Sequence, residues 1–377
     1  MPKKVFILAG EASGDLQGAF LVKELKKLRG DIEFAGIGGR LLKEEGVDVI
    51  CDTTCLGVVG PWNAILKLPF LFWKVEELKR RLLDYRPDLL VMIDSPALNM
   101  RMGKFARAHG IETLYYFPPS AWYRNSERAA KISAVSSYLV PVFDYQVKTF
   151  EEAGVPFRHF GHPILDVVAE KLRTMGGLDL PEGRKIVAFL PGSRPQEVNS
   201  LMKVYIRTMR AMLLKRSDLF FLIPASSPDM KALIERYMAP CSDIPFRIVE
   251  GGSYLALSHA SAAVTASGTA TLEASVLGVP MTVVYKLAWP DWILGKLIMI
   301  KVPMFALPNL VLQKKSVPEL LQTEVNPERI MDEVFRVLDD SPERTKMLET
   351  LAAIKRSLGE EGAVRRIAEY LNDILKD

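Results

Sequence analysis

The chain has 377 residues, of which 49% are hydrophobic and 25% are charged, a composition typical of a globular protein long enough for two domains. The net charge of +4 is too small to indicate a nucleic-acid-binding protein, and the three cysteines argue against a disulfide framework and for a reducing compartment. Cys51 and Cys55 lie close in sequence, but no second pair or histidine cluster completes a zinc site, so we expect no metal.

The first half of the chain alternates apolar strands with helices. We expect strands at 5–9, 34–37, 89–93, 113–117 and 138–141. The run 5–9 is too short for a signal peptide, since Gly10 and Glu11 follow it at once. No stretch reaches the roughly 18–20 uninterrupted apolar residues of a membrane-spanning helix. Continuous apolar strands between helices predict a parallel sheet covered on both faces.

The same pattern restarts in the second half, with strands expected at 186–190, 219–223, 246–249, 262–265 and 281–285. The sequence therefore predicts the α/β class, with two doubly wound Rossmann-like domains at 1–163 and 164–354. A helical tail follows, from Pro342 to Leu375. Because open sheets bind ligands at the carboxyl ends of their strands, we expect both sets of strand ends to face an interdomain cleft.

Polar residues follow two of the strands expected in the first half. Glu11, Ser13, Gly14 and Asp15 follow the first strand, where they could bind a sugar or cap the next helix. Their spacing is not that of a dinucleotide-binding fingerprint, and acidic residues there would repel a phosphate, so we do not expect NAD.

Asp94 directly follows the strand at 89–93, where its carboxylate could act as a general base toward a substrate hydroxyl or cap a helix. Asn99 could orient a substrate or complete the turn. His162, between Gly161 and Pro163, is more typical of a hinge than of a catalyst.

The second half offers two candidate anion sites. Arg194 ends the segment Pro191-Gly192-Ser193-Arg194, and its guanidinium suits a diphosphate, although a surface ion pair is the alternative. Residues 267–273 form a turn of small residues between a strand and a helix. The unpaired amides and dipole of a helix N-terminus predict a nucleotide there, with its diphosphate on the amides and its ribose on Glu273; an ordinary capped helix is the alternative.

Two segments, 62–74 and 289–305, combine large apolar residues with lysines. They are either buried helices or surfaces that contact lipid. The side chains expected to contact acyl chains or a membrane are Trp62, Phe70, Phe72, Trp73, Trp289 and Trp292.

Taken together, these motifs resemble the lipid A disaccharide synthase family, inverting glycosyltransferases of the two-domain GT-B fold. The matching motifs are 10–15, 86–88, 93–96 with Asn99, 119–122, 161–163, 190–194 with Glu197, 267–273 and 307–309. They run in the family's order across almost the whole chain.

The resemblance implies transfer of 2,3-diacylglucosamine from its UDP derivative to 2,3-diacylglucosamine 1-phosphate (lipid X), which forms the β-1,6-linked lipid A disaccharide 1-phosphate and UDP. It implies Asp94 as the general base and neither a cofactor nor a metal. The implied donor-binding residues are Arg194, Ser193, Gly192, Ser267, Gly268, Thr269, Ala270, Thr271, Glu273 and Asn309. The substrate-binding candidates are Glu11, Ser13, Gly14, Asp15, Asn99, Ser120, Trp122 and His162.

The resemblance also implies that residues 355–377 pack back onto the N-terminal, acceptor-binding domain. It implies a cytoplasmic protein attached peripherally to the cytoplasmic face of the inner membrane, and it leaves a homodimer open. Departures from the family motifs, such as Ala97 and Leu98 before Asn99, keep a GT-B enzyme acting on another glycolipid as an alternative. Further alternatives are an enzyme like UDP-N-acetylglucosamine 2-epimerase and a non-catalytic protein that binds a nucleotide or glycolipid.

Overall fold

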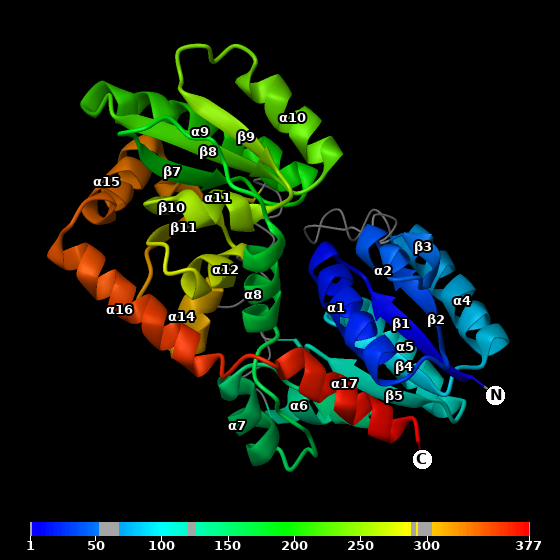
Figure 1. Ribbon diagram of the computed structural model, residues 1–377. Coiled ribbons are helices and arrows are strands. Elements are labelled where there is room, and N and C mark those ends of the chain that lie inside the picture. The colour runs from blue at the N-terminus through cyan, green and yellow to red at the C-terminus, as the bar shows by residue number, and fades with distance from the viewer. Residues whose placement is uncertain (1, 53–67, 120–125, 288–291, 293–303, 377) are drawn as a thin grey trace. The chain divides into compact units, whose positions relative to one another are not determined.

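The computed structural model describes residues 2–52, 68–119, 126–287, 292 and 304–376 (Figure 1). The described residues divide into two compact units. The first lies within Met1–Val59, Asn63–Asp166 and Leu358–Asp377, and the second within Val167–Ser357. Each unit contains one sheet with helices on both of its faces (Figure 1).

The first unit is built on a six-stranded parallel sheet with strand order β3-β2-β1-β4-β5-β6. Its strands are β1 (Lys3–Ala9), β2 (Ile32–Gly38), β3 (Asp48–Asp52), β4 (Leu89–Ile93), β5 (Glu112–Tyr116) and β6 (Tyr138–Val140). Ile7 of β1 lies beside Gly36 of β2 on one side and beside Val91 of β4 on the other. The strand order reverses between β1 and β4, where such sheets bind their ligands.

The described helices of the first unit include one from the end of the chain. They are α1 (Ala12–Leu28), α2 (Arg40–Glu44), α4 (Leu68–Tyr85), α5 (Pro96–Ala108), α6 (Ser126–Ser133), α7 (Asp144–Glu152) and α17 (Ala363–Ile374). Helix α17 packs beside α1 (Figure 1). The Asp166 carboxylate holds the first turn of α17, because it accepts hydrogen bonds from the amides of Gly362 and, at 2.8 Å, Val364.

The second unit repeats the architecture, with strand order β12-β11-β10-β7-β8-β9. Its strands are β7 (Lys185–Leu190), β8 (Leu219–Ala225), β9 (Phe246–Glu250), β10 (Ala262–Ala266), β11 (Met281–Tyr285) and β12 (Glu319–Leu321). Its described helices are α9 (Pro195–Lys215), α10 (Pro228–Met238), α11 (Ser253–His259), α12 (Ala270–Val276), α14 (Leu307–Leu312), the 3₁₀ helix η3 (Gln322–Glu324), α15 (Pro327–Leu338) and α16 (Pro342–Ser357). Helix α8 (Ile164–Thr174) runs from the first unit into the second.

The central strands form the core of each unit. Every residue of β4 and of β10 is buried, and this explains why both strands are uninterrupted apolar or small-residue runs in the sequence. In the first unit, Val75, Leu78 and Leu82 of α4 belong to the same buried cluster as strand residues such as Leu90. The two doubly wound parallel sheets predicted from the sequence are thus confirmed.

Two strands were not predicted, and both lie at an edge of their sheet. β3 begins and ends with an aspartate, and β12 has only three residues and begins with Glu319. An edge strand is covered by fewer neighbours, so it needs neither the length nor the continuous apolar run that marks a central strand.

Candidate active site

Asp94 lies directly after β4, where the strand order of the first sheet reverses. Asp94 and Ser95 both have left-handed backbone conformations, with φ of 50° and 37°. Such conformations are unfavourable for residues other than glycine, although Asp and Asn tolerate them best, and they gather at functional sites. The fold therefore maintains a strained turn at the residue predicted to be the base.

The peptide groups of this turn are fixed on both sides of Asp94. Its amide donates to the Tyr116 carbonyl at 3.2 Å, and its carbonyl accepts from Asn99 Nδ2 at 2.6 Å and from Tyr115 Oη at 2.8 Å. Asn99 Nδ2 also donates to the Ile93 carbonyl at 3.1 Å. Both Asn99 and Tyr115 are fully buried.

The Nδ2 group of Asn99 therefore serves the backbone of the turn, whereas its Oδ1 accepts no hydrogen bond within the described residues, and its role as a substrate ligand stays a prediction. Sequence reasoning missed Tyr115. Its pKa is raised, first by burial and then by the negative charge of Asp94. In the sequence, Tyr115 looks like any other core residue of an apolar strand.

The turn after β1 lies against the turn after β4. A Cβ atom on Gly10 would lie 3.0 Å from Ser95 Cβ and closer still to Ser95 Oγ, so only glycine allows this approach. Glu11 is the N-cap residue of α1, Ser13 is partly buried and Gly14 is buried. The predicted residues after β1 and Asp94 thus share the carboxyl edge of one sheet.

Asp15 is the exception among them, because its side chain caps a different helix. Its carboxylate accepts hydrogen bonds from the amides of Gly39 at 2.7 Å, Leu41 at 3.0 Å and Leu42 at 3.1 Å, at the start of α2. It is only 5% exposed. These contacts support a structural role for Asp15 instead of a sugar-binding one.

Replacing Asp15 by Ala is therefore expected to destabilise the first unit. Three amides lose a charged acceptor, and we expect the free energy of unfolding to fall by about 2–3 kcal/mol. Chemical denaturation followed by circular dichroism measures this change. Asp15→Asn keeps one acceptor oxygen and should lose less; an equal loss for both variants would contradict the capping role.

His162 is 2% exposed and lies between Phe117 and Phe143, with ring centroids 5.4 and 4.7 Å away. Its Nδ1 accepts a hydrogen bond from the Ile164 amide at 3.0 Å, and its own amide donates to the Leu358 carbonyl at 2.8 Å. Burial, with a smaller effect of His159, lowers its pKa to about 3. His162 is thus neutral and joins the chain before α8 to the segment before α17.

This pKa predicts a pH dependence of stability. In the unfolded chain a histidine titrates near pH 6.5, so protons bind mainly to the unfolded state as the pH falls from 6.5 toward 3. The stabilisation is therefore complete above pH 6.5 and is lost on acidification, by about 2 kcal/mol at pH 5. We expect the free energy of unfolding of the wild type to fall by this amount relative to His162→Asn between pH 7 and pH 5, and a constant difference would refute the assignment.

In the second unit, Gly192, Ser193 and Arg194 connect β7 to α9. Gly192 has φ of 102°, and a Cβ there would lie 2.7 Å from Glu197 Cβ, so the turn requires glycine. Glu197 Oε2 accepts from the amides of Ser193 at 3.0 Å and Arg194 at 3.3 Å, and its Oε1 lies 3.4 Å from Arg194 Nη1. Arg194, with 38% of its side chain exposed, is therefore both held and partly neutralised by Glu197.

The turn from β10 into α12 contains the other predicted donor residues. Gly268, Thr269 and Ala270 are partly exposed, and a Cβ on Gly268 would meet no described atom within 4 Å. Ser267 donates to the Phe305 carbonyl at 3.2 Å, and Thr271, which is buried, donates to the Gly268 carbonyl at 2.7 Å. The hydroxyls of Ser267 and Thr271 thus bond to the backbone of the turn and of a neighbouring segment.

Glu273 lies one turn into α12 and is 6% exposed. Its carboxylate accepts a hydrogen bond from the Ser253 hydroxyl at the start of α11, a partner that the sequence did not reveal. Burial raises its pKa, and the bond from Ser253 opposes that shift. A buried carboxyl with a perturbed pKa in the first turns of a helix that follows a central strand is typical of a functional site.

The side chain of Asn309, also predicted to bind the donor, is held by neighbouring residues of the second unit. Its Nδ2 donates to the Val317 carbonyl at 2.9 Å and to Glu319 Oε1 at 2.8 Å, and its Oδ1 accepts from the amides of Ser316 and Val317, both at 2.8 Å. Both amide hydrogens of the carboxamide are thus used within the unit, and the role of Asn309 in donor binding stays a prediction.

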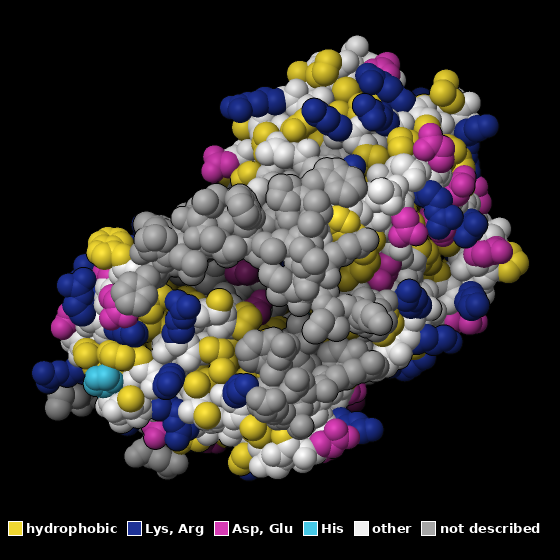
Figure 2. Space-filling model, turned by 180° about the vertical axis from the view of Figure 1, so that it is seen from behind, with side chains coloured by type: hydrophobic (Ala, Val, Ile, Leu, Met, Phe, Trp, Pro, Cys, Tyr) yellow, Lys and Arg dark blue, Asp and Glu magenta, His cyan; other side chains and the backbone are white. Residues whose placement is uncertain are grey.

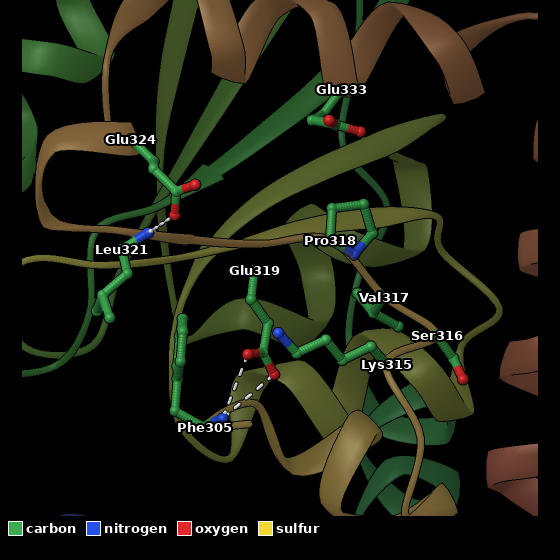
Figure 3. A pocket seen from close by; sticks show the side chains of 9 residues that line it. All are labelled: Phe305, Lys315, Ser316, Val317, Pro318, Glu319, Leu321, Glu324 and Glu333. Carbon is green, nitrogen blue, oxygen red and sulfur yellow. Dashed lines mark hydrogen bonds between the residues drawn. The ribbon is translucent and has the colours of Figure 1, made fainter. Parts of the chain in front are cut away.

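Glu319 also lines a pocket of about 620 Å³ in the second unit (Figure 3). The pocket is lined by Phe305, Lys315, Ser316, Val317, Pro318, Glu319, Leu321, Glu324 and Glu333. Figure 3 shows the Glu319 carboxylate directed at the Phe305 amide, 3.2 Å away. The pocket contains none of the residues predicted to bind a substrate, and Glu319 connects it to Asn309.

Of the aromatic residues predicted to contact lipid, Trp73 on α4 is 56% exposed, and Lys74 Nζ lies 5.5 Å from its ring centroid. Trp292 is partly buried. Trp62 and Trp289, and the substrate candidates Ser120 and Trp122, lie outside the described residues, as do the side chains of Phe70 and Phe72.

Three observations concern the described residues as a whole. None of the helices in the described ranges is both long and apolar enough to cross a bilayer. In these same ranges, no three His, Cys, Asp or Glu side chains are grouped as metal ligands. On the face shown in Figure 2, Lys and Arg are interspersed with Asp and Glu.

The chain matches a family model described as lipid-A-disaccharide synthetase over residues 5–373. It is 36% identical over 376 residues to lipid-A-disaccharide synthase of Azotobacter vinelandii, with 98% of each chain covered. It is 35% identical over 380 residues to the synthase of Syntrophus aciditrophicus, with 99% of this chain and 98% of the relative covered.

Solved structures confirm the GT-B-like fold. UDP-GlcNAc 2-epimerase from Neisseria meningitidis, bound to UDP-GlcNAc, superposes with a TM-score of 0.66 at 15% identity, covering 98% of this chain and 100% of that one. The calicheamicin glycosyltransferase CalG4 gives a TM-score of 0.58 at 17% identity, covering 100% and 98%. At these identities the likeness concerns the fold alone, whereas family membership is shown by the sequence matches. The chain therefore belongs to the lipid-A-disaccharide synthetase family of glycosyltransferases.

Proposed function

We propose that the chain transfers 2,3-diacylglucosamine from its UDP derivative to the 6-hydroxyl of 2,3-diacylglucosamine 1-phosphate, giving the β-1,6-linked disaccharide 1-phosphate and UDP. The observation that carries this proposal is the family match, which spans residues 5–373. The left-handed backbone of Asp94, which the buried side chains of Asn99 and Tyr115 hold in place, is consistent with this proposal.

In the proposed step, Asp94 accepts the proton of the acceptor's 6-hydroxyl. The oxygen forms a bond to the anomeric carbon of the donor sugar while the bond from that carbon to the diphosphate breaks, which inverts the configuration. The electron pair of the broken bond leaves with UDP. A carboxylate performs this role when it lies within hydrogen-bond reach of the hydroxyl and is ionised at the working pH.

The second unit supplies the donor-binding groups in this proposal. Arg194 neutralises the negative charge that develops on the departing diphosphate. The turn at 267–270 lies beside the diphosphate, and Glu273 binds the ribose. The partial exposure of residues 267–270 and the buried carboxyl that follows them support the assignment.

The acylated substrates would lie at the cytoplasmic face of the inner membrane, and we propose that the chain binds there peripherally. The exposed Trp73 supports this, because an indole ring with a neighbouring lysine suits the interface between acyl chains and head groups.

Mass spectrometry of the products tests the proposed reaction. The protein is incubated with UDP-2,3-diacylglucosamine and lipid X, and a disaccharide 1-phosphate that requires both substrates is the expected product. Interconversion of UDP-N-acetylglucosamine with its 2-epimer would instead support the epimerase alternative. Binding of UDP without any turnover would support the non-catalytic one.

A further inference from the structure

Two buried side chains converge on one carbonyl oxygen in the turn that carries Asp94. Asn99 approaches the Asp94 carbonyl from α5, and Tyr115 approaches it from β5, the neighbouring strand of the sheet. The Tyr115 ring lies in the apolar core of the first unit, so its hydroxyl has a fixed position. The two contacts hold the turn from different elements.

The backbone of this turn depends on such contacts. Two successive residues with side chains, Asp94 and Ser95, have φ of 50° and 37°. A conformation of this kind persists only where the surrounding structure enforces it. The Asn99 amide also donates to the Ser95 carbonyl at the start of its own helix. The hydroxyl of Tyr115 donates to the Asp94 carbonyl and interacts with the Asn99 side chain, so both of its polar contacts are with this turn and the residue that supports it.

We propose that Tyr115 is a positioning residue for the transfer reaction: its buried hydroxyl fixes the peptide carbonyl of Asp94 and thereby holds the Asp94 carboxylate in its reactive orientation. This inference rests on the proposed role of Asp94 as the base. According to this inference, loss of the Tyr115 hydroxyl slows the chemical step and leaves the binding of both substrates unchanged.

The adjacent Tyr116 provides a matched control. It lies on the same strand and is equally buried, but within the described part of the chain its hydroxyl has no hydrogen-bond partner. Tyr115→Phe and Tyr116→Phe therefore remove the same atom from neighbouring core positions. Only the first removes a bond to the catalytic turn.

The test compares kcat and KM for both substrates, and the thermal stability, of the two variants and the wild type. Since small displacements of a catalytic group reduce rates strongly, we expect Tyr115→Phe to lower kcat by about 10-fold or more with KM for both substrates within about twofold. Tyr116→Phe should keep kcat within about twofold of the wild type.

The outcomes separate this inference from the proposed function. If Tyr115→Phe retains the kcat of Tyr116→Phe while Asp94→Asn is inactive, Tyr115 is not a positioning residue and the base assignment stands. If Tyr115→Phe changes KM and kcat together in proportion to its loss of stability, its role is structural only. If Asp94→Asn itself turns over at the wild-type rate, the proposed base is wrong, and this inference falls with it.

Discussion

Replacing Asp94 by Asn is expected to lower kcat for disaccharide formation by about 10³-fold, within the range that a general base contributes. Asn matches Asp in size but cannot accept the proton of the acceptor hydroxyl at neutral pH. It also tolerates the left-handed backbone that position 94 requires, so the turn at φ of 50° should persist. The measurement is the initial rate of product formation, followed by mass spectrometry.

The effect should be confined to the chemical step, so UDP affinity measured by calorimetry is expected to stay within a few-fold of the wild type. Asp88 offers a matched control at the opposite end of β4, where its carboxylate accepts a hydrogen bond from the Lys4 amide at 2.7 Å. Asp88→Asn makes the same chemical change away from the proposed site and should leave kcat within about twofold. Near wild-type turnover of Asp94→Asn would remove this residue from the base role.

The central strands of both sheets could be predicted because strands buried on both faces appear in the sequence as continuous apolar runs. Residues 89–93 and 281–285 are continuous runs of mostly apolar residues, and the strands occupy these same ranges. The location of Asp94 followed from such a run, because a polar residue directly after a buried strand lies at the edge where ligands bind. The sequence therefore predicts which residues lie at the ends of the central strands.

The task of each polar side chain was less predictable. The Asp15 carboxylate accepts hydrogen bonds from the amides of Gly39, Leu41 and Leu42. The Asn309 side chain forms hydrogen bonds with Ser316, Val317 and Glu319. Such partners are brought together by the tertiary fold, and the sequence of a turn is the same whether its carboxylate serves a helix or a sugar. Tyr115 could not be found at all, because its importance lies in a single hydroxyl on an otherwise apolar strand.

Glu197 shows why Arg194 is the residue of the second unit most open to test. Its carboxylate already holds the amides of Ser193 and Arg194, and it lies beside the Arg194 guanidinium. The turn therefore carries one negative and one positive side chain at the N-terminus of α9. In the proposed donor site the Arg194 cation attracts the diphosphate, because without it the Glu197 charge would repel the ligand.

Arg194→Ala is accordingly expected to raise the Kd for UDP by about 10- to 100-fold, the loss that corresponds to one or two charge-assisted hydrogen bonds. Isothermal titration calorimetry with UDP measures this directly, independently of the acceptor. Arg210 on the same helix is the control, since it pairs with Asp243 at 2.7 and 2.9 Å, and Arg210→Ala should leave the Kd unchanged. Arg194→Lys restores the charge but not the planar fork, so it should recover only part of the affinity. An unchanged Kd for Arg194→Ala would place the diphosphate elsewhere. Without the Arg194 cation, the Glu197 carboxylate would repel a diphosphate bound at this turn, so the Kd could not stay the same.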